Sequence, residues 1–175
     1  LDSGFFFILL RIFKGYKLRK LSGYLFLRKF LQVSDVKKFK FLTIDPSHTE
    51  AKYNLEYLRK NNIKNVTSYV APLYKSEIKD KKLLKKIKIL KPKYILINLG
   101  GEVQEILALY IKNNTKFNIS IFCTGAAIAF LTKRQAPIND YIDKMYLGWF
   151  VRMLHDPKKH FNRVISSLNL VKFFV

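Results

Sequence analysis

Strand-like and helix-like segments alternate four times through the middle of this 175-residue chain, and this alternation constrains the fold more than any other feature. The predicted strands are KFKFLTI (38–44), NVTSYVA (65–71), KYILIN (93–98) and FNISIFC (117–123). Amphipathic segments with helical spacing of their apolar residues lie between them. Strands joined by helices through short connections form parallel sheets with helices on both faces. We therefore predict an α/β fold with a Rossmann-like parallel sheet flanked by helices.

The predicted helices begin with two short ones, at 4–14 and 23–33, of which the second is capped by Ser22. The capping-box sequence SHTE (47–50) starts the next one, and two more are expected at about 75–90 and 102–113. Beyond about residue 133 the chain becomes helical, basic and aromatic, with helices expected near 138–147, 148–155 and 157–168.

The change in composition near residue 133 suggests a division into two parts. We predict an α/β core over residues 1–132 and a basic helical C-terminal appendage over residues 133–175. The chain begins without Met, at a point typical of the middle of a domain, so we expect further residues upstream.

The net charge of the chain limits the classes of partner that it is expected to bind. Lys and Arg number 33 against 12 Asp and Glu, a formal net charge of +21. Such an excess implies a polyanionic neighbour: nucleic acid, an anionic membrane surface or a phosphate-bearing substrate. Cys123 is the only cysteine, which rules out an intrachain disulfide and fits a reducing compartment. No apolar run approaches the roughly 18 residues that span a bilayer.

Several common catalytic signatures are missing from the sequence. There is no G-x-G-x-x-G fingerprint, no phosphate-binding P-loop and no G-x-S-x-G elbow. The three histidines form no metal-ligand pattern with Cys123, and no Asp-x-Asp pair is present to hold a metal-bound nucleotide. These absences favour chemistry without a metal.

The stretch LGGEVQE (99–105) follows a predicted buried strand. One interpretation is a strand-to-helix corner, with Glu102 and Glu105 in the first helical turn, where acids suit the helix dipole. The other is a small-molecule site, because ligands of open parallel sheets bind at the carboxyl ends of strands.

Three further stretches also have both a structural and a functional interpretation. In LDSGFF (1–6), Asp2 is either a helix cap or a catalytic base. In CTGAAIAFLTKRQAP (123–137), Gly125 and Ala126 allow close approach of either a packed helix or a ligand. In YLGWFVRMLHDPKKHFNR (146–163), basic and aromatic residues mark either a solvated basic face or a contact with a membrane or phosphate.

Four of these motifs, in this order, resemble the WecG/TagA/CpsF family of glycosyltransferases. They are DSGF (2–5), GGEVQE (100–105), TGAAIAFLTKRQAP (124–137) and LGWFVRMLHDPKKHFNR (147–163), and the resemblance covers the chain from Asp2 to about Arg163. It implies a metal-independent, inverting transfer of an N-acetylmannosamine-type sugar from a UDP donor. The acceptor would be a sugar on a polyprenyl diphosphate, in the synthesis of a cell-surface polysaccharide or teichoic acid.

The resemblance also implies roles for individual residues. Asp2 matches the proposed catalytic base, and Gln104 matches the Gln at the donor site. The remaining donor-binding residues would be Gly100, Gly101, Glu102, Glu105, Gly125 and Ala126, and the diphosphate would be met by Arg134, Arg152 and Arg163. No cofactor or metal is expected.

The implied partners are a UDP-sugar donor, a polyprenyl-diphosphate-linked acceptor and an anionic membrane surface. No nucleic acid is expected as a partner, and the chain could form an oligomer. The expected location is cytoplasmic, peripheral on the inner face of the cell membrane.

The sequence departs from the family pattern at several positions. Glu102 or Val103 stands where the family has Pro, and Gln135 interrupts the usual Arg-Ala-Pro. The aromatic of the Gly-x-x-Phe stretch is Ile128, unless Phe130 takes its place, and Gly148 replaces the Glu before Trp149. Two alternatives stay open: a catalytically degenerate binder of lipid-linked sugar, which the loss of the Glu before Trp149 suggests, and a basic nucleic-acid-binding module, which the net charge suggests.

Overall fold

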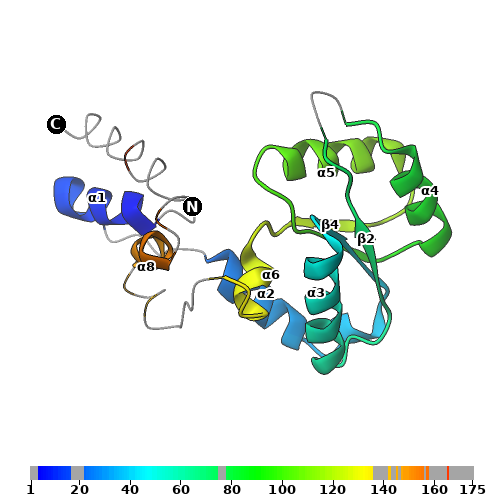
Figure 1. Cartoon of the computed structure of the whole chain (residues 1–175), viewed down its shortest axis with the longest axis horizontal. Helices are drawn as coiled ribbons and strands as arrows, with labels where there is room; N and C mark the ends of the chain where they lie inside the picture. Colours follow the sequence, from blue (N-terminus) through cyan, green and yellow to red (C-terminus); the bar gives the residue numbers. More distant parts are fainter. Residues whose placement is uncertain are drawn as a thin grey trace. The chain divides into compact units, whose positions relative to one another are not determined.

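We analysed a computed structural model of the chain (Figure 1). It describes residues 4–16, 22–74 and 78–135, and beyond these residues 142, 145, 147–155, 157 and 165. The chain divides into two compact units. One unit is Leu27–Thr132, and the other combines Leu1–Phe26 with Lys133–Val175. Residues 1–26, which the sequence-based division placed in the core, thus group here with the C-terminal segment.

The unit Leu27–Thr132 is built on a four-stranded, all-parallel sheet with the strand order β2-β1-β3-β4. The strands are β1 (Phe41–Asp45), β2 (Val66–Val70), β3 (Tyr94–Ile97) and β4 (Ser120–Cys123). In the register, Phe41 pairs with both Val66 and Tyr94, and Tyr94 pairs with Ser120. The predicted parallel α/β sheet is confirmed. All five residues of β1 are buried, as expected for a central strand covered on both faces.

Helices cover both faces of this sheet, with α5 above it and α3 below it in Figure 1. The C-terminal part of α2 (Gly23–Gln32), α3 (His48–Lys60) and α6 (Ala127–Leu131) pack on one face, around Phe41 and Leu96. On the other face, α4 (Lys81–Leu90) and α5 (Val103–Asn114) pack around Leu42 and Ile95. Alternate residues of each strand therefore supply two separate cores.

An aromatic group stiffens the α2 side of the sheet. Phe30 of α2 lies with its ring centroid 5.1 Å from that of Tyr94 and 4.8 Å from that of Phe122. The Phe41 and Tyr94 centroids are 5.0 Å apart. Tilted and edge-on rings at these spacings add about 0.5–1.5 kcal/mol per pair beyond their burial. These contacts attach α2 to β1, β3 and β4.

Side-chain caps fix where three of the helices begin. Ser22 Oγ accepts from Leu25 N, as predicted, and Ser47 Oγ accepts from Glu50 N at 3.2 Å. Asp80 Oδ1 accepts from Leu83 N at 2.8 Å, so α4 begins at Lys81, later than the predicted start near residue 75. Residues 75–77 lie outside the described part of the chain. Such caps contribute on the order of 1 kcal/mol each.

The Asp80 carboxylate also holds the segment between β2 and α4. Its Oδ2 accepts from Tyr69 Oη and from Tyr74 Oη, both at 2.8 Å. Burial, followed by the hydrogen bond to Asp80, raises the pKa of each tyrosine well above its usual range. Both phenols therefore remain protonated donors at physiological pH.

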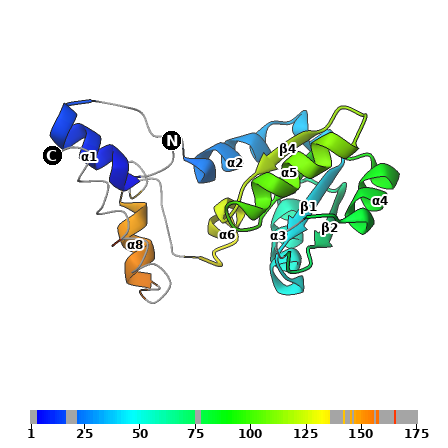
Figure 2. The ribbon, with the colours of Figure 1, turned by 90° about the horizontal axis from the view of Figure 1, so that it is seen from above.

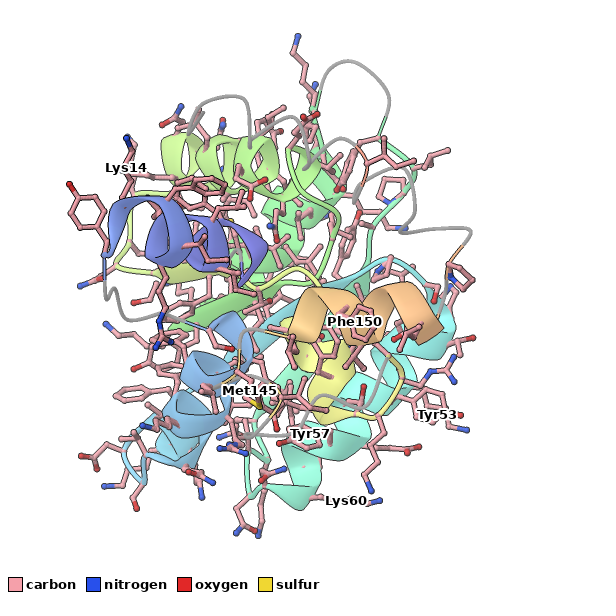
Figure 3. The ribbon with its side chains drawn as sticks, turned by 90° about the vertical axis from the view of Figure 1, so that its left-hand side faces the viewer. Lys14, Tyr53, Tyr57, Lys60, Met145 and Phe150 are labelled. Carbon is pink, nitrogen blue, oxygen red and sulfur yellow. The ribbon has the colours of Figure 1, made fainter. Side chains whose placement is uncertain are left out.

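The second unit contains α1 (Gly4–Lys14) and α8 (Gly148–His155), which lie side by side in Figures 1 and 2. The predicted helices at 4–14 and 148–155 are confirmed. Figure 3 labels Lys14 on α1 and Phe150 on α8, and both side chains are exposed. Within the described part of the chain, no helix is both long enough and apolar enough to cross a membrane.

Most predicted boundaries hold to within a few residues. The strand predicted at 38–44 begins only at Phe41, because Val36–Lys38 forms a short 3-10 helix (η1) whose Val36 is buried. Similarly, β4 starts at Ser120 instead of residue 117. The helices predicted near 138–147 and 157–168 lie largely outside the described residues.

Candidate functional site

The carboxyl ends of β1 and β3 meet at the point where the strand order reverses. The chain runs from β1 to β2 on one side of the sheet and then crosses to β3 on the other side. In open parallel sheets the crevice at such a reversal is the usual place for a ligand. Here β1 ends at Asp45 and β3 at Ile97, and Asn98 N donates to Ile44 O at 2.9 Å.

Five polar residues, the Asp45 cluster, fill this point: Thr43, Asp45, Asn54, Ser68 and Asn98. The Asp45 carboxylate is fully buried. Its Oδ1 accepts from Asn54 Nδ2 and Asn98 Nδ2, both at 2.7 Å. Its Oδ2 accepts from Thr43 Oγ1 and Ser68 Oγ, both at 2.6 Å. Four donors match the acceptor capacity of one carboxylate, so its burial is compensated.

The Asp45 cluster was not among the residues predicted from sequence. The predicted strand ends at Ile44, and none of the four motifs includes Asp45. A usable signal was present, since Asp45 and Asn98 are polar residues directly at the ends of two apolar strands. Because the four donors of the cluster already occupy the Asp45 carboxylate, we look for the candidate ligand site at the ends of β3 and β4.

Beside it, at the ends of β3 and β4, lies the Gln104 cluster of Gln104, Glu105 and Gly125. Gln104 is in the first turn of α5 and is 9% exposed. Its Oε1 accepts from Gly125 N at 2.9 Å, and its Nε2 donates to Glu105 Oε1 at 2.8 Å. These bonds fix the orientation of the carboxamide and leave one Nε2 hydrogen without a partner among the described residues. The structure thus brings together Gln104, Glu105 and Gly125, three of the residues that the resemblance assigns to the donor site.

In the loop before α5, the strained backbone conformation falls on a glutamate and not on either of the two glycines. Gly100 and Gly101 are exposed, neither has a positive φ, and a Cβ on either would meet nothing within 4 Å. The positive φ, +69°, falls instead on Glu102, the N-cap residue of α5. Such a conformation costs a non-glycine residue on the order of 1–3 kcal/mol. Neither a positive φ nor a steric contact therefore explains the two glycines.

Gly125 differs from those two glycines because its backbone conformation favours glycine. It has φ +50°, a left-handed conformation that side chains disfavour. A Cβ there would lie 3.6 Å from Gln104 Oε1 and from Leu99 O, which is ordinary contact. Ala126 follows as the N-cap residue of the short helix α6. The left-handed conformation of Gly125 thus shapes the turn after β4, where the Gly125 N–H meets the Gln104 side chain.

Cys123, the last residue of β4, borders the same cluster. Its thiol lies 3.6 Å from Gln104 O, a weak hydrogen bond. Burial, and then the charge of Glu105, raise the pKa of Cys123 above its usual value. A thiol that resists ionisation is a poor nucleophile. Cys123 therefore lies beside the Gln104 cluster as a thiol whose ionisation is disfavoured.

The remaining predicted site residues are placed less completely. Arg134 is exposed and belongs to the second unit. Arg152 is placed by its backbone, within α8. Asp2 and Arg163 lie outside the described residues. Among the side chains that the structure describes, no three His, Cys, Asp or Glu residues come together as a metal site requires.

Comparison with known proteins assigns the family. A comparison with curated proteins finds no match. The chain does match the model of the family described as "Glycosyl transferase WecG/TagA/CpsF family", and the match extends over residues 1–175. It confirms the resemblance drawn from the four motifs. The chain therefore belongs to the WecG/TagA/CpsF family of glycosyl transferases.

Proposed function

We propose that this glycosyl transferase moves an N-acetylmannosamine-type sugar from a UDP donor to a sugar on a polyprenyl diphosphate, with inversion and without a metal. The observation that carries the proposal is the fixed carboxamide of Gln104 beside two glycines that folding does not require. A bound donor supplies the missing reason for those glycines, because a Cβ would obstruct its approach to the backbone.

The charge of the loop indicates which part of the donor it binds. Glu102 and Glu105 are both exposed beside Gln104. Two carboxylates repel a diphosphate, but they accept hydrogen bonds from sugar or ribose hydroxyls. We therefore assign the uridine or sugar hydroxyls to this loop.

The diphosphate then needs cations from elsewhere in the chain. Arg134, Arg152 and Arg163 are the proposed groups, because guanidinium groups bind phosphate oxygens in pairs of hydrogen bonds. As the bond to the sugar breaks, negative charge grows on the leaving UDP, and these arginines would stabilise it in place of a metal. Asp2 would take the proton from the attacking acceptor hydroxyl.

A lipid-linked acceptor requires contact with a membrane. The formal net charge of +21 favours an anionic leaflet, where each nearby Lys or Arg contributes on the order of 1 kcal/mol. Exposed apolar side chains such as Ile12 and Leu154, on α1 and α8, suit the same surface. We propose a peripheral location on the inner face of the cell membrane, with a role in polysaccharide or teichoic acid synthesis.

The decisive experiment measures UDP release from UDP-N-acetylmannosamine, with and without a GlcNAc-diphosphate-polyprenyl analogue and with and without EDTA. We expect release that depends on the acceptor and survives EDTA. Release that EDTA abolishes would contradict the metal-free mechanism. No release despite UDP binding would favour another donor sugar or a binder without catalysis.

The degenerate binder is the second candidate, and Gly148 favours it, because the family has a carboxylate at that position. The substitution Gly148→Glu distinguishes a degenerate binder from an active transferase. A rise from no turnover to measurable turnover would identify a degenerate site, whereas an active wild type would exclude one. A nucleic-acid-binding module would instead bind DNA more tightly than anionic vesicles, with a steep salt dependence.

A further inference from the structure

The Asp45 cluster and the Gln104 cluster are connected by three hydrogen bonds and the peptide bond between Thr124 and Gly125. Asn98 Nδ2 donates to Asp45 Oδ1, and Asn98 Oδ1 accepts from Thr124 Oγ1 at 2.7 Å. Thr124 directly precedes Gly125, whose N–H donates to Gln104 Oε1. The series runs from a buried carboxylate on β1 to the carboxamide at the proposed donor site.

Asp45 determines which way the Asn98 carboxamide faces. A carboxylate only accepts, so the amide NH₂ of Asn98 must point toward Asp45 and its oxygen must point away. The reversed amide would set two oxygens against each other inside the protein, where an unpaired polar group costs about 1–3 kcal/mol. The oxygen that points away is the acceptor for the Thr124 hydroxyl.

Thr124 in turn holds the turn after β4. Its hydroxyl lies between Asn98 Oδ1 and Ile97 O, which is 3.0 Å away. Ile97 O also accepts from Thr124 N at 3.0 Å and from Gly125 N at 3.1 Å. The Gly125 N–H is thus shared between Ile97 O and Gln104 Oε1. Thr124 and Gly125 thus donate to the same carbonyl oxygen, Ile97 O.

We propose that Thr124 and Asn98 are positioning residues, which orient the Gly125 amide and through it the Gln104 carboxamide, with Asp45 setting the direction of the whole series. The functional part of this inference rests on the proposed donor site. Its geometric part, the dependence of the Gly125 amide on Thr124, stands without it.

The test compares two hydroxyl deletions in the full chain. Thr124→Val keeps the side-chain shape but removes the hydroxyl bonds to Asn98 Oδ1 and Ile97 O, and Thr124→Ser restores the hydroxyl. Ser68→Ala is the matched control, because it also removes one hydroxyl from the network, on Asp45 Oδ2, where Thr43 still donates. Thr124→Ala provides a second deletion if the Val variant does not fold. The readouts are UDP affinity by calorimetry and hydrogen exchange of the Gly125 amide by NMR, both well below the unfolding temperature.

We expect Thr124→Val to weaken UDP binding about tenfold, as the loss of one orienting hydrogen bond predicts, and to speed Gly125 exchange by a similar factor. Thr124→Ser should match the wild type in both readouts. Ser68→Ala should lower the unfolding temperature but leave the UDP affinity and the Gly125 exchange rate unchanged. Unchanged Gly125 exchange in the Thr124→Val and Thr124→Ala chains overturns the positioning role, whether or not UDP binds. Equal effects of Thr124→Val and Ser68→Ala on affinity also overturn it. A wild type that does not bind UDP, with exchange still dependent on Thr124, refutes the donor site and leaves the geometric part supported.

Discussion

The backbone N–H of Gly125, just after β4, donates a 2.9 Å hydrogen bond to Oε1 of Gln104, in the first turn of α5. Two motifs separated by 21 positions in the chain thus meet through a single bond at the carboxyl edge of the sheet. Because the acceptor is a side chain and the donor is backbone, the bond can be removed by one substitution without changing the strand. This makes Gln104 the most direct point at which to test the candidate site.

Gln104→Ala should weaken UDP binding tenfold or more, on the order of 1.4 kcal/mol or above, because it removes the carboxamide and leaves Gly125 N with only Ile97 O as acceptor. Isothermal titration with UDP measures the loss. Asn114→Ala is the matched control, because it deletes an amide that bonds backbone at the far end of the same helix. Equal affinities for the two variants would remove Gln104 from the donor site.

Gly101→Ala and Gly125→Ala should separate binding from folding. Gly125→Ala forces a side chain into φ +50° and should lower the free energy of unfolding by about 1–2 kcal/mol. Gly101→Ala meets no neighbour within 4 Å and has no positive φ, so its unfolding midpoint should not fall. Its UDP affinity should nevertheless drop. An affinity equal to that of the wild type would show that the donor does not approach Gly101.

Asp45→Asn should be among the most destabilising substitutions in the chain. The new NH₂ group would replace one of the two carboxylate oxygens, each of which now accepts two hydrogen bonds. We expect a loss of about 3 kcal/mol or more in denaturant unfolding. Asp35→Asn is the control, since its exposed pair with Lys38 should contribute at most about 1 kcal/mol. Comparable losses for the two variants would contradict the buried network.

The reactivity of Cys123 should report on Glu105. Burial and then the Glu105 charge raise the pKa of the Cys123 thiol, so removing that charge lowers the pKa and increases the thiolate fraction. Glu105→Gln should therefore speed alkylation by iodoacetamide at a fixed mildly alkaline pH. Glu102→Gln should not, because Glu102 is not among the causes of the shift. Mass spectrometry of the single cysteine follows the rate, and identical rates for both variants would refute the coupling.

The raised thiol pKa also predicts a pH dependence of stability. A thiol whose pKa is higher in the folded state contributes stability that is complete below its unfolded-state pKa. This contribution is then lost as the pH rises toward the folded-state value. Replacing Cys123 with Ser should flatten the alkaline decline in unfolding midpoint.

Asp2→Asn tests the proposed general base. The transfer rate should fall at least tenfold, since such bases usually contribute 10²–10⁴-fold, while UDP binding stays nearly unchanged. Acceptor-dependent UDP release measures the rate, and calorimetry measures the binding. If the variant kept more than about a tenth of the wild-type rate, another group would have to take the proton.

The sequence by itself determined the class of fold and the family. Apolar runs such as YILI (94–97) and amphipathic segments such as 48–60 are short-range patterns, and their alternation implies a parallel sheet with helices on both faces. Helix capping by Ser22 and Ser47 could also be predicted from the sequence, because a capping side chain and the backbone amide that donates to it lie within three residues. The motifs, taken in order, indicated the glycosyl transferase family that the full-length match confirms.

Only the tertiary structure decided which polar side chains meet at the carboxyl edge. Asp45 and Asn98 are separated by 53 positions, and although each is a polar residue at the end of an apolar strand, nothing local shows that the two side chains meet. Their contact depends on β1 and β3 being neighbours, whereas sequence order alone suggests β1 beside β2 and β2 beside β3. The tertiary structure also decided the positive φ of Glu102. From the sequence alone, one of the two preceding glycines would be expected to adopt that conformation. Strand order and loop conformation are set by how the whole sheet packs, and local patterns do not encode that.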